Sequence, residues 1–190
     1  MNKLHVKIRG IRPLLMHNPR GANPADPLTR KKKELTGKRK KTDEDYELIG
    51  KLEFQQGMYY DEEVGPYVPA DWLIGMIQSG AKANKNGKKV LAGVDIEDEI
   101  NPLIYEGPRT MEKLLDDVRF WDTRPVNVIN NKVMRVRPRF QRWELAFTIL
   151  YYPQVIDKDE LTMALNDACI FKGLGDYRPR YGKFEIVETK

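Results

Sequence analysis

The order in which strand-like and helical apolar patterns follow one another is the feature that most constrains the fold of this 190-residue chain. Leu4, Val6 and Ile8 alternate with polar side chains, a pattern typical of a strand with one buried face. Pro69, a residue that suits the first turn of a helix, precedes an apolar stripe at helical spacing. Residues 143–152 are the most hydrophobic β-like stretch, and we expect them to form a central strand.

Two further patterns complete this order. Residues 157–171 repeat apolar side chains at helical spacing behind Asp157, a candidate N-cap, and 183–187 predict a last strand. Asn130-Asn131 separates two β-like runs and predicts a hairpin turn before the central strand. The order strand, helix, strand, strand, helix, strand predicts an α+β fold, a ferredoxin-like (RRM-like) sandwich.

A strongly basic segment interrupts this pattern after the first strand. Eight of the twelve residues in 30–41 are basic and almost none is apolar, so we expect an exposed or flexible segment outside the core. Thr42 and Asp45 then match a capping box, which predicts a helix over 43–56. We therefore interpret 20–60 as a large basic insertion.

The charge distribution favours a polyanionic partner. Lys and Arg number 33 against 28 Asp and Glu, a net charge of +5, and the basic residues gather at 30–41, 82–89, 132–142 and 178–183. A segregated distribution of this kind is typical of a basic face that binds nucleic acid.

Cysteine and histidine are too few for a metal site. The single cysteine, Cys169, excludes an internal disulfide and indicates a reducing compartment. The two histidines have no partner at ligand spacing, so we expect neither a metal nor a cofactor. No apolar run is long enough to span a membrane, and the first residues lack a signal-peptide core, so we expect a cytoplasmic protein.

Two patterns of arginine and glycine supply the candidate contacts. Arg135, Arg137 and Arg139 recur at period two, which predicts one exposed basic strand face. Residues 173–184 combine glycines with arginines and tyrosines, as in a loop that contacts phosphates and stacks on bases. The predicted nucleic-acid contacts are Arg30, Lys31, Lys32, Lys33, Lys38, Arg39, Lys40, Lys41, Arg135, Arg137, Arg139, Arg142, Gly173, Gly175, Tyr177, Arg178, Arg180 and Gly182.

Three segments carry a resemblance to a known family. Residues 67–77, Tyr-Val-Pro-Ala-Asp-Trp-Leu-Ile-Gly-Met-Ile, resemble a helix start of RAMP proteins, which include the backbone subunits of CRISPR effector complexes. Residues 173–184 resemble the glycine-rich loop of that family. Residues 26–30, Asp-Pro-Leu-Thr-Arg, are similar to a loop whose aspartate helps cut target RNA in type III backbone subunits. Departures such as Ala70-Asp71-Trp72 and Asp176 indicate a diverged or phage-encoded relative.

The resemblance implies one RAMP-like domain over 1–190, with 20–60 as its thumb or finger region. It also implies single-stranded RNA as the partner and a homo-oligomer or filament along the strand. We interpret the chain as a sequence-tolerant protein that binds single-stranded RNA or DNA, RNA preferred, with no membrane partner and no assigned catalytic residue. Two alternatives stay open: a RAMP-type endoribonuclease that uses Asp26 or His17, and a basic module that binds an acidic protein.

Overall fold

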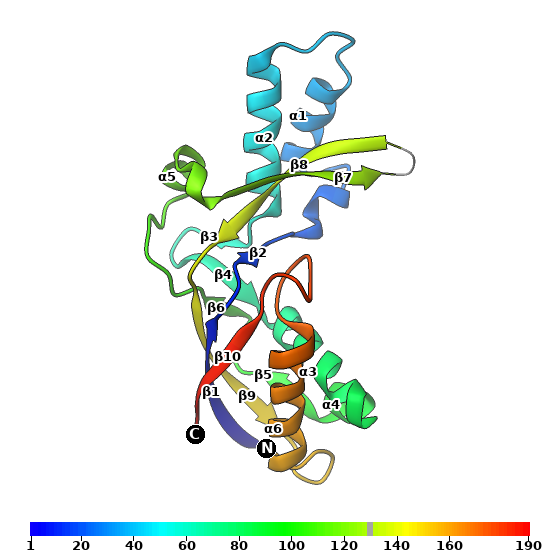
Figure 1. Ribbon diagram of the computed structural model, residues 1–190, viewed down its shortest axis with the longest axis vertical. Helices are drawn as coiled ribbons and strands as arrows, with labels where there is room; N and C mark the ends of the chain where they lie inside the picture. Colours follow the sequence, from blue (N-terminus) through cyan, green and yellow to red (C-terminus); the bar gives the residue numbers. More distant parts are fainter. Residues whose placement is uncertain (129–130) are drawn as a thin grey trace.

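A four-stranded antiparallel sheet occupies one end of an elongated molecule (Figure 1). The computed structural model describes residues 1–128 and 131–190. The strands of this sheet, in the spatial order β10-β1-β9-β5, are β1 (Asn2–Gly10), β5 (Val94–Ile96), β9 (Glu144–Tyr151) and β10 (Phe184–Thr189). In chain order this is fourth, first, third, second, the arrangement of a ferredoxin-like sheet. The α+β, ferredoxin-like prediction is therefore confirmed.

The alternation seen in the sequence decides which face of the sheet is covered. Leu4, Val6 and Ile8 on β1 are at most 3% exposed, whereas the intervening His5 is exposed and Lys7 is half-buried. Strand β9 alternates in the same way and pairs with β1 on one side and with β5 on the other. The prediction of a central strand at 143–152 is thus confirmed.

Two helices pack together on the buried face of this sheet (Figure 1). They are α3 (Ala70–Ala81) and α6 (Lys158–Asp167), and a π-helical turn, Ala168–Lys172, extends α6. Asp157 caps α6 through a capping box with Glu160, as the sequence predicts. Gly80 lets the helices approach closely, because a Cβ on Gly80 would lie 2.0 Å from the Ala164 carbonyl oxygen.

The segment between β1 and α3 forms the first of two excursions from this core. Its elements are β2 (Leu14–Leu15), the 3-10 turn η1 (Pro19–Ala22), α1 (Pro27–Thr36), α2 (Asp43–Gly57), β3 (Tyr60–Asp61) and β4 (Gly65–Pro69). Helix α2 begins at the predicted Thr42–Asp45 capping box. The first half of 30–41 is helical within α1, since Asp26 caps the helix and Pro27 occupies its first turn.

A second excursion, of which the hairpin was anticipated from the sequence, separates β5 from β9. It contains β6 (Ile100–Pro102), α5 (Met111–Asp116), η3 (Val118–Phe120), β7 (Trp121–Val128) and β8 (Asn131–Phe140). The β7–β8 hairpin joins β2 in a separate sheet, β2-β8-β7, and β3, β4 and β6 form a third sheet. Asn130 of the predicted turn lies outside the described residues, and Asn131 pairs with Val128.

The two excursions meet at the opposite end of the molecule from the four-stranded sheet (Figure 1). Helix α2 packs on β8, and α1 packs on α2. Two short helices, η2 (Lys82–Asn84) and α4 (Gly87–Gly93), follow α3 and carry the basic residues of 82–89. Among the described residues, no helix has the length and apolar character needed to cross a membrane.

Candidate nucleic-acid interface

The 173–182 segment, called here the glycine-rich loop, lies against β2, between the sheet end and the two excursions (Figure 1). The amide of Asp176 donates to the Leu15 carbonyl oxygen at 2.9 Å, and the amide of Gly182 donates to the Pro13 carbonyl oxygen at 2.8 Å. These hydrogen bonds fix the loop on the segment that links β1 to the first excursion.

The glycines of this loop permit close backbone contact. Gly175 and Gly182 have φ of +79° and +68°, and a Cβ on Gly182 would lie 1.6 Å from the Leu174 carbonyl oxygen. The amide of Gly173 donates to the Ala168 carbonyl oxygen at 2.8 Å. The amides of Gly173 and Gly182 are thus engaged inside the protein, and the arginine side chains are the groups that the loop presents to solvent.

Arg178 and Arg180 are exposed, whereas Tyr177 is half-buried beside two other arginines. The guanidinium carbons of Arg124 and Arg137 lie 4.7 and 5.0 Å from the centroid of the Tyr177 ring. Cations over an aromatic face are attracted by its quadrupole, so both arginines stabilise the loop. A base that stacks on Tyr177 would share the ring with these guanidinium groups.

The expectation of an exposed arginine face on β8 is wrong, since Arg135, Arg137 and Arg139 are all half-buried. Arg135 Nη1 donates to Glu53 Oε1 at 2.6 Å, and Arg137 Nε lies 2.6 Å from Asp176 Oδ2. The Arg137 side chain is only 13% exposed. The physical reason is that helix α2 and the glycine-rich loop pack over this face of β8 and bring carboxylates to it.

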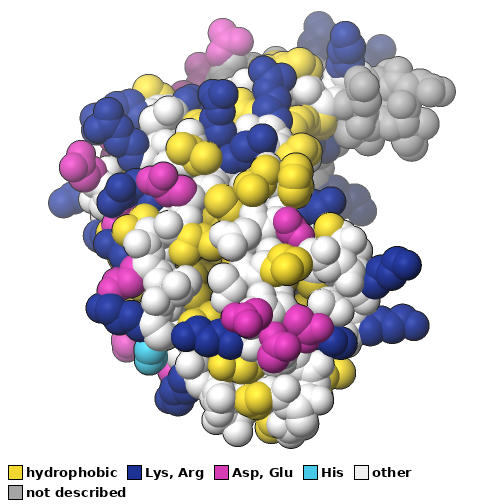
Figure 2. All heavy atoms as spheres, turned by 60° about the horizontal axis from the view of Figure 1, so that its bottom comes forward, with side chains coloured by type: hydrophobic (Ala, Val, Ile, Leu, Met, Phe, Trp, Pro, Cys, Tyr) yellow, Lys and Arg dark blue, Asp and Glu magenta, His cyan; other side chains and the backbone are white. Residues whose placement is uncertain are grey.

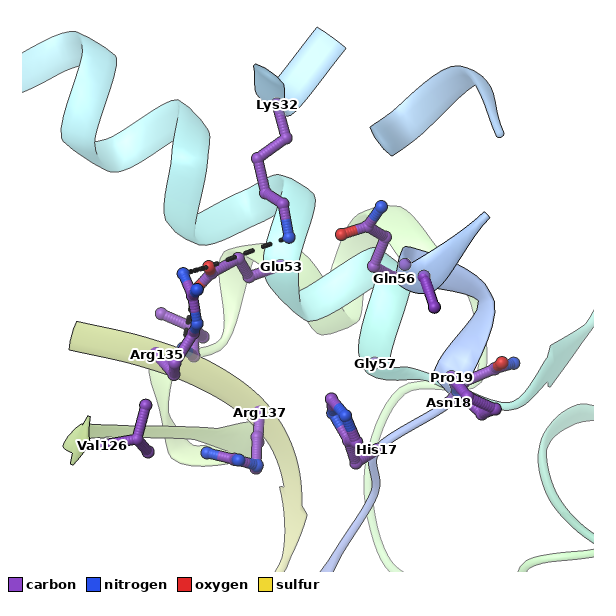
Figure 3. A pocket seen from close by; sticks show the side chains of 13 residues that line it. His17, Asn18, Pro19, Lys32, Glu53, Gln56, Gly57, Val126, Arg135 and Arg137 are labelled. Carbon is purple, nitrogen blue, oxygen red and sulfur yellow. Dashed lines mark hydrogen bonds and ion pairs between the residues drawn. The ribbon is translucent and has the colours of Figure 1, made fainter. Parts of the chain in front are cut away.

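A cavity of about 380 Å³, called here the inner hollow, lies between α1, α2, β7, β8 and the chain after β2 (Figure 3). Its polar lining consists mainly of His17, Lys32, Glu53, Gln56, Arg135 and Arg137. Figure 3 shows Lys32 reaching from α1 towards Glu53, and Arg135 meeting the same carboxylate from β8. The inner hollow thus gathers cations from two excursions that are distant in the sequence.

Burial in this hollow lowers the pKa of two basic side chains, Lys32 and His17. Desolvation lowers the pKa of Lys32, although the carboxylate of Glu53 at 3.9 Å opposes the shift. Desolvation also lowers the pKa of His17, and Arg137 lowers it further, whereas Asp176 opposes the shift. Both side chains line the hollow, where Lys32 is half-buried and His17 is exposed.

A second and larger hollow, of about 940 Å³ and called here the outer hollow, is lined in part by Pro179, Arg180 and Tyr181 of the glycine-rich loop. Its charged lining consists of Arg12, Arg139, Arg180 and Lys183, and no carboxylate belongs to the described lining. Sequence reasoning selected Arg139 and Arg180 but missed Arg12 and Lys183. Arg12 is a single basic residue after the first strand and has no local signal, whereas Lys183 belongs to the basic cluster 178–183 but was not selected from it.

The remaining predicted cations lie in other surroundings. Arg30, Lys31 and Lys33 are exposed on α1. In the segment that follows, Arg39 and Lys40 are exposed, Lys38 pairs with Asp45 at 2.6 Å, and Lys41 donates to the Lys38 carbonyl oxygen at 2.9 Å. Arg142 lines a different cavity with Tyr105 and Glu106. The structure therefore brings Arg142 into neither hollow.

The open face of the four-stranded sheet is electrically balanced. Lys7 and Arg9 on β1 pair with Glu144 on β9 at 2.7 and 2.8 Å, and Arg9 lies 3.6 Å from Glu185 on β10. Lys3 pairs with Glu97. In Figure 2, Lys and Arg side chains cover the upper part and the margins of the drawn face, and acidic side chains gather lower on it. The basic side chains that alternate with the apolar ones on β1 are thus paired with carboxylates of neighbouring segments.

Asp26 is buried and is the N-cap of α1. Its Oδ1 accepts from the Thr29 amide at 3.1 Å, and its Oδ2 accepts from Arg20 Nη2 at 2.8 Å. These contacts, the Arg20 hydrogen bond first, lower the pKa of the Asp26 carboxyl. Within residues 1–128 and 131–190, no group of three His, Cys, Asp or Glu side chains could hold a metal ion.

Comparison with known proteins gives a likeness of fold. No protein-family model matches the chain. No curated protein matches it either. Among solved structures, it is similar to a chain of the type III-B Cmr-β complex bound to cognate target RNA, determined by cryo-electron microscopy, with 13% identity and a TM-score of 0.50. The alignment covers 99% of this chain and 59% of the solved chain, so this chain spans about three-fifths of the length of that neighbour.

Proposed function

We propose that this chain binds single-stranded nucleic acid through its sugar–phosphate backbone, with RNA preferred over DNA and little dependence on sequence. The observation that carries this proposal is the outer hollow. Arg12, Arg139, Arg180 and Lys183 come from three distant segments and line one concave surface, which has no carboxylate among the residues that the structure describes. Like charges repel unless an anion neutralises them, and a phosphate backbone supplies evenly spaced anions.

The surroundings of the outer hollow suit a strand rather than a single ion. The exposed Arg178 continues the basic surface along the glycine-rich loop, and Tyr181 gives the hollow an aromatic wall on which a base can stack. Gln141 adds an amide within reach of phosphate or sugar oxygens. Contacts of these kinds read backbone and shape, so the proposal expects sequence tolerance.

The fold likeness supports RNA as the preferred strand. The similar solved chain belongs to a complex that holds target RNA, and it covers nearly all of this chain. We extend the proposal to several copies of this chain along one strand.

The balanced open face of the sheet supports the placement of the nucleic acid at the outer hollow, because the positive charges of that face are paired with carboxylates.

Fluorescence anisotropy with labelled single-stranded RNA and DNA of one sequence, in a salt series, tests the proposal. If about six phosphates are neutralised, the logarithm of the association constant should fall with a slope of about −4 against the logarithm of salt concentration. RNA should bind more tightly than DNA, and a scrambled RNA should bind as well as the first. A nearly salt-independent affinity contradicts the proposal.

A pair of charge reversals locates the site. Arg12→Glu with Arg180→Glu changes two exposed residues of the outer hollow, and Lys88→Glu with Lys158→Glu is the matched control at exposed residues outside it. The first pair should weaken binding at least about tenfold and make the slope shallower by about 1.4, the value for two lost phosphate contacts. Equal losses in both pairs would show that only net charge matters and would remove the outer hollow as the site.

A further inference from the structure

The inner hollow combines cationic side chains with an apolar one. Lys32, Arg135 and Arg137 line it, and Val126 lies on the same face of the β7–β8 hairpin as the two arginines (Figure 3). Its volume of about 380 Å³ falls in the range of pockets that hold small molecules. Such a cavity suits a ligand with one anionic end and one flat, weakly polar end.

The charges in this hollow are not fully compensated. Glu53 is the only carboxylate of the described lining, and it is only 5% exposed. It accepts from Arg135 Nη1 at 2.6 Å and from the Val136 amide at 3.0 Å, so its position is fixed. Three cations against Glu53 leave two positive charges in excess, and counting Asp176, which pairs with Arg137 from outside the lining, still leaves one.

One buried donor in the wall lacks an acceptor. Arg137 Nη1 is shielded from solvent and has no hydrogen-bond partner among the described residues. A buried guanidinium N–H without an acceptor is unfavourable, so a ligand oxygen that reaches it is stabilised by more than the charge alone. His17 is exposed and lies near Arg137 in the lining of the hollow (Figure 3).

We propose that the inner hollow is a separate site for a nucleoside monophosphate. The phosphate would lie among Lys32, Arg137 and His17, and the base would lie against Val126. Glu53 holds Arg135 in place. The nucleoside monophosphate can be a free nucleotide or the phosphorylated end of a nucleic-acid strand. The hollow would recognise the same phosphate and base in both. This site is distinct from the outer hollow, so monophosphate binding can be tested independently of strand binding.

Isothermal titration calorimetry of the full chain at low salt tests this inference. The probes are the four ribonucleoside 5′-monophosphates, the four matching nucleosides and inorganic phosphate. A second arm compares a single-stranded RNA that has a 5′-phosphate with the same RNA that has a 5′-hydroxyl. We expect at least one monophosphate, or the 5′-phosphorylated strand, to bind at least about tenfold more tightly than its partner without the phosphate.

Substitutions on one helix provide the control. Lys32→Ala removes the inward-facing cation of α1, and Lys33→Ala removes its exposed neighbour. Lys32→Ala should weaken the phosphate-dependent binding at least about fivefold, Lys32→Arg should restore most of it, and Lys33→Ala should leave it unchanged. Thermal unfolding without ligand shows that each variant is folded.

The outcomes separate this inference from the proposed function. Preserved monophosphate binding in the Arg12→Glu, Arg180→Glu variant supports two sites. Binding of nucleosides as tight as that of their monophosphates overturns the inference, as does equal loss in Lys32→Ala and Lys33→Ala. Absence of a phosphate effect in both arms overturns it even if long strands bind.

Discussion

Asp26 shows how a residue with a suggestive sequence position can serve the fold. Asp26→Ala removes the N-cap of α1 and the partner of Arg20, so the free energy of unfolding should fall by about 1 kcal/mol. Asp26→Asn keeps the cap and loses the ion pair, so it should cost less, because Arg20 is largely exposed. Urea unfolding measures both variants. An unchanged unfolding free energy in Asp26→Ala would contradict the structural role.

The residue scale also shows where prediction from sequence stops. The cations of the interface follow from composition and from the period-two arginines, and the structure places several of them around two hollows. Their acidic partners do not follow from local pattern, because Glu53 is 82 residues from Arg135. Arg12 and Lys183 join Arg139 only because the chain folds back on itself. A local pattern holds no information about such pairs.

At the scale of elements, α3 offers a matched pair of glycines. A Cβ on Gly80 would lie 2.0 Å from the Ala164 carbonyl oxygen of α6, whereas a Cβ on Gly75 would meet nothing within 4 Å. Gly80→Ala should therefore force α3 and α6 apart and destabilise the protein by about 3 kcal/mol. Gly75→Ala should stabilise the helix by up to about 1 kcal/mol. Chemical unfolding measures both, and similar values for the two variants would contradict the close packing.

Element types were more predictable than element partners. The capping boxes at Thr42 and Asp157 are local, and both helices begin where those residues stand. Helix α1 was missed because its sequence has almost no apolar stripe. It folds through its Asp26 cap and its contact with α2. The β7–β8 hairpin was expected, but its separate sheet was not, since alternation within a strand does not say which strand lies beside it.

For the whole molecule, ion pairs between elements predict a loss of stability in acid. The hydrogen bond from Lys7, followed by the one from Arg9, lowers the pKa of Glu144. Lys89 on α4 lowers the pKa of Glu160 on α6, and this ion pair joins the two helices. A carboxyl whose pKa is lower in the folded state stabilises that state above its unfolded pKa, and this stability is lost as the pH falls. The thermal midpoint should thus change little between about pH 5 and 8 and drop below about pH 4. Glu144→Gln should reduce the drop, and an unaltered pH profile in that variant would contradict the assignment.

The topology was predictable as a whole because the six core elements keep their order despite two long interruptions. That same order has a mechanical result. Strand β1 lies between β9 and β10 in the sheet. In the chain, the exposed stretch 37–40 separates β1 from the other three strands of that sheet. Protease cleavage in that stretch would give two fragments that still share one sheet. The smaller, N-terminal fragment would be held through the pairing of β1 with β9 and β10. The protein is in this sense a natural candidate for division into two complementing halves.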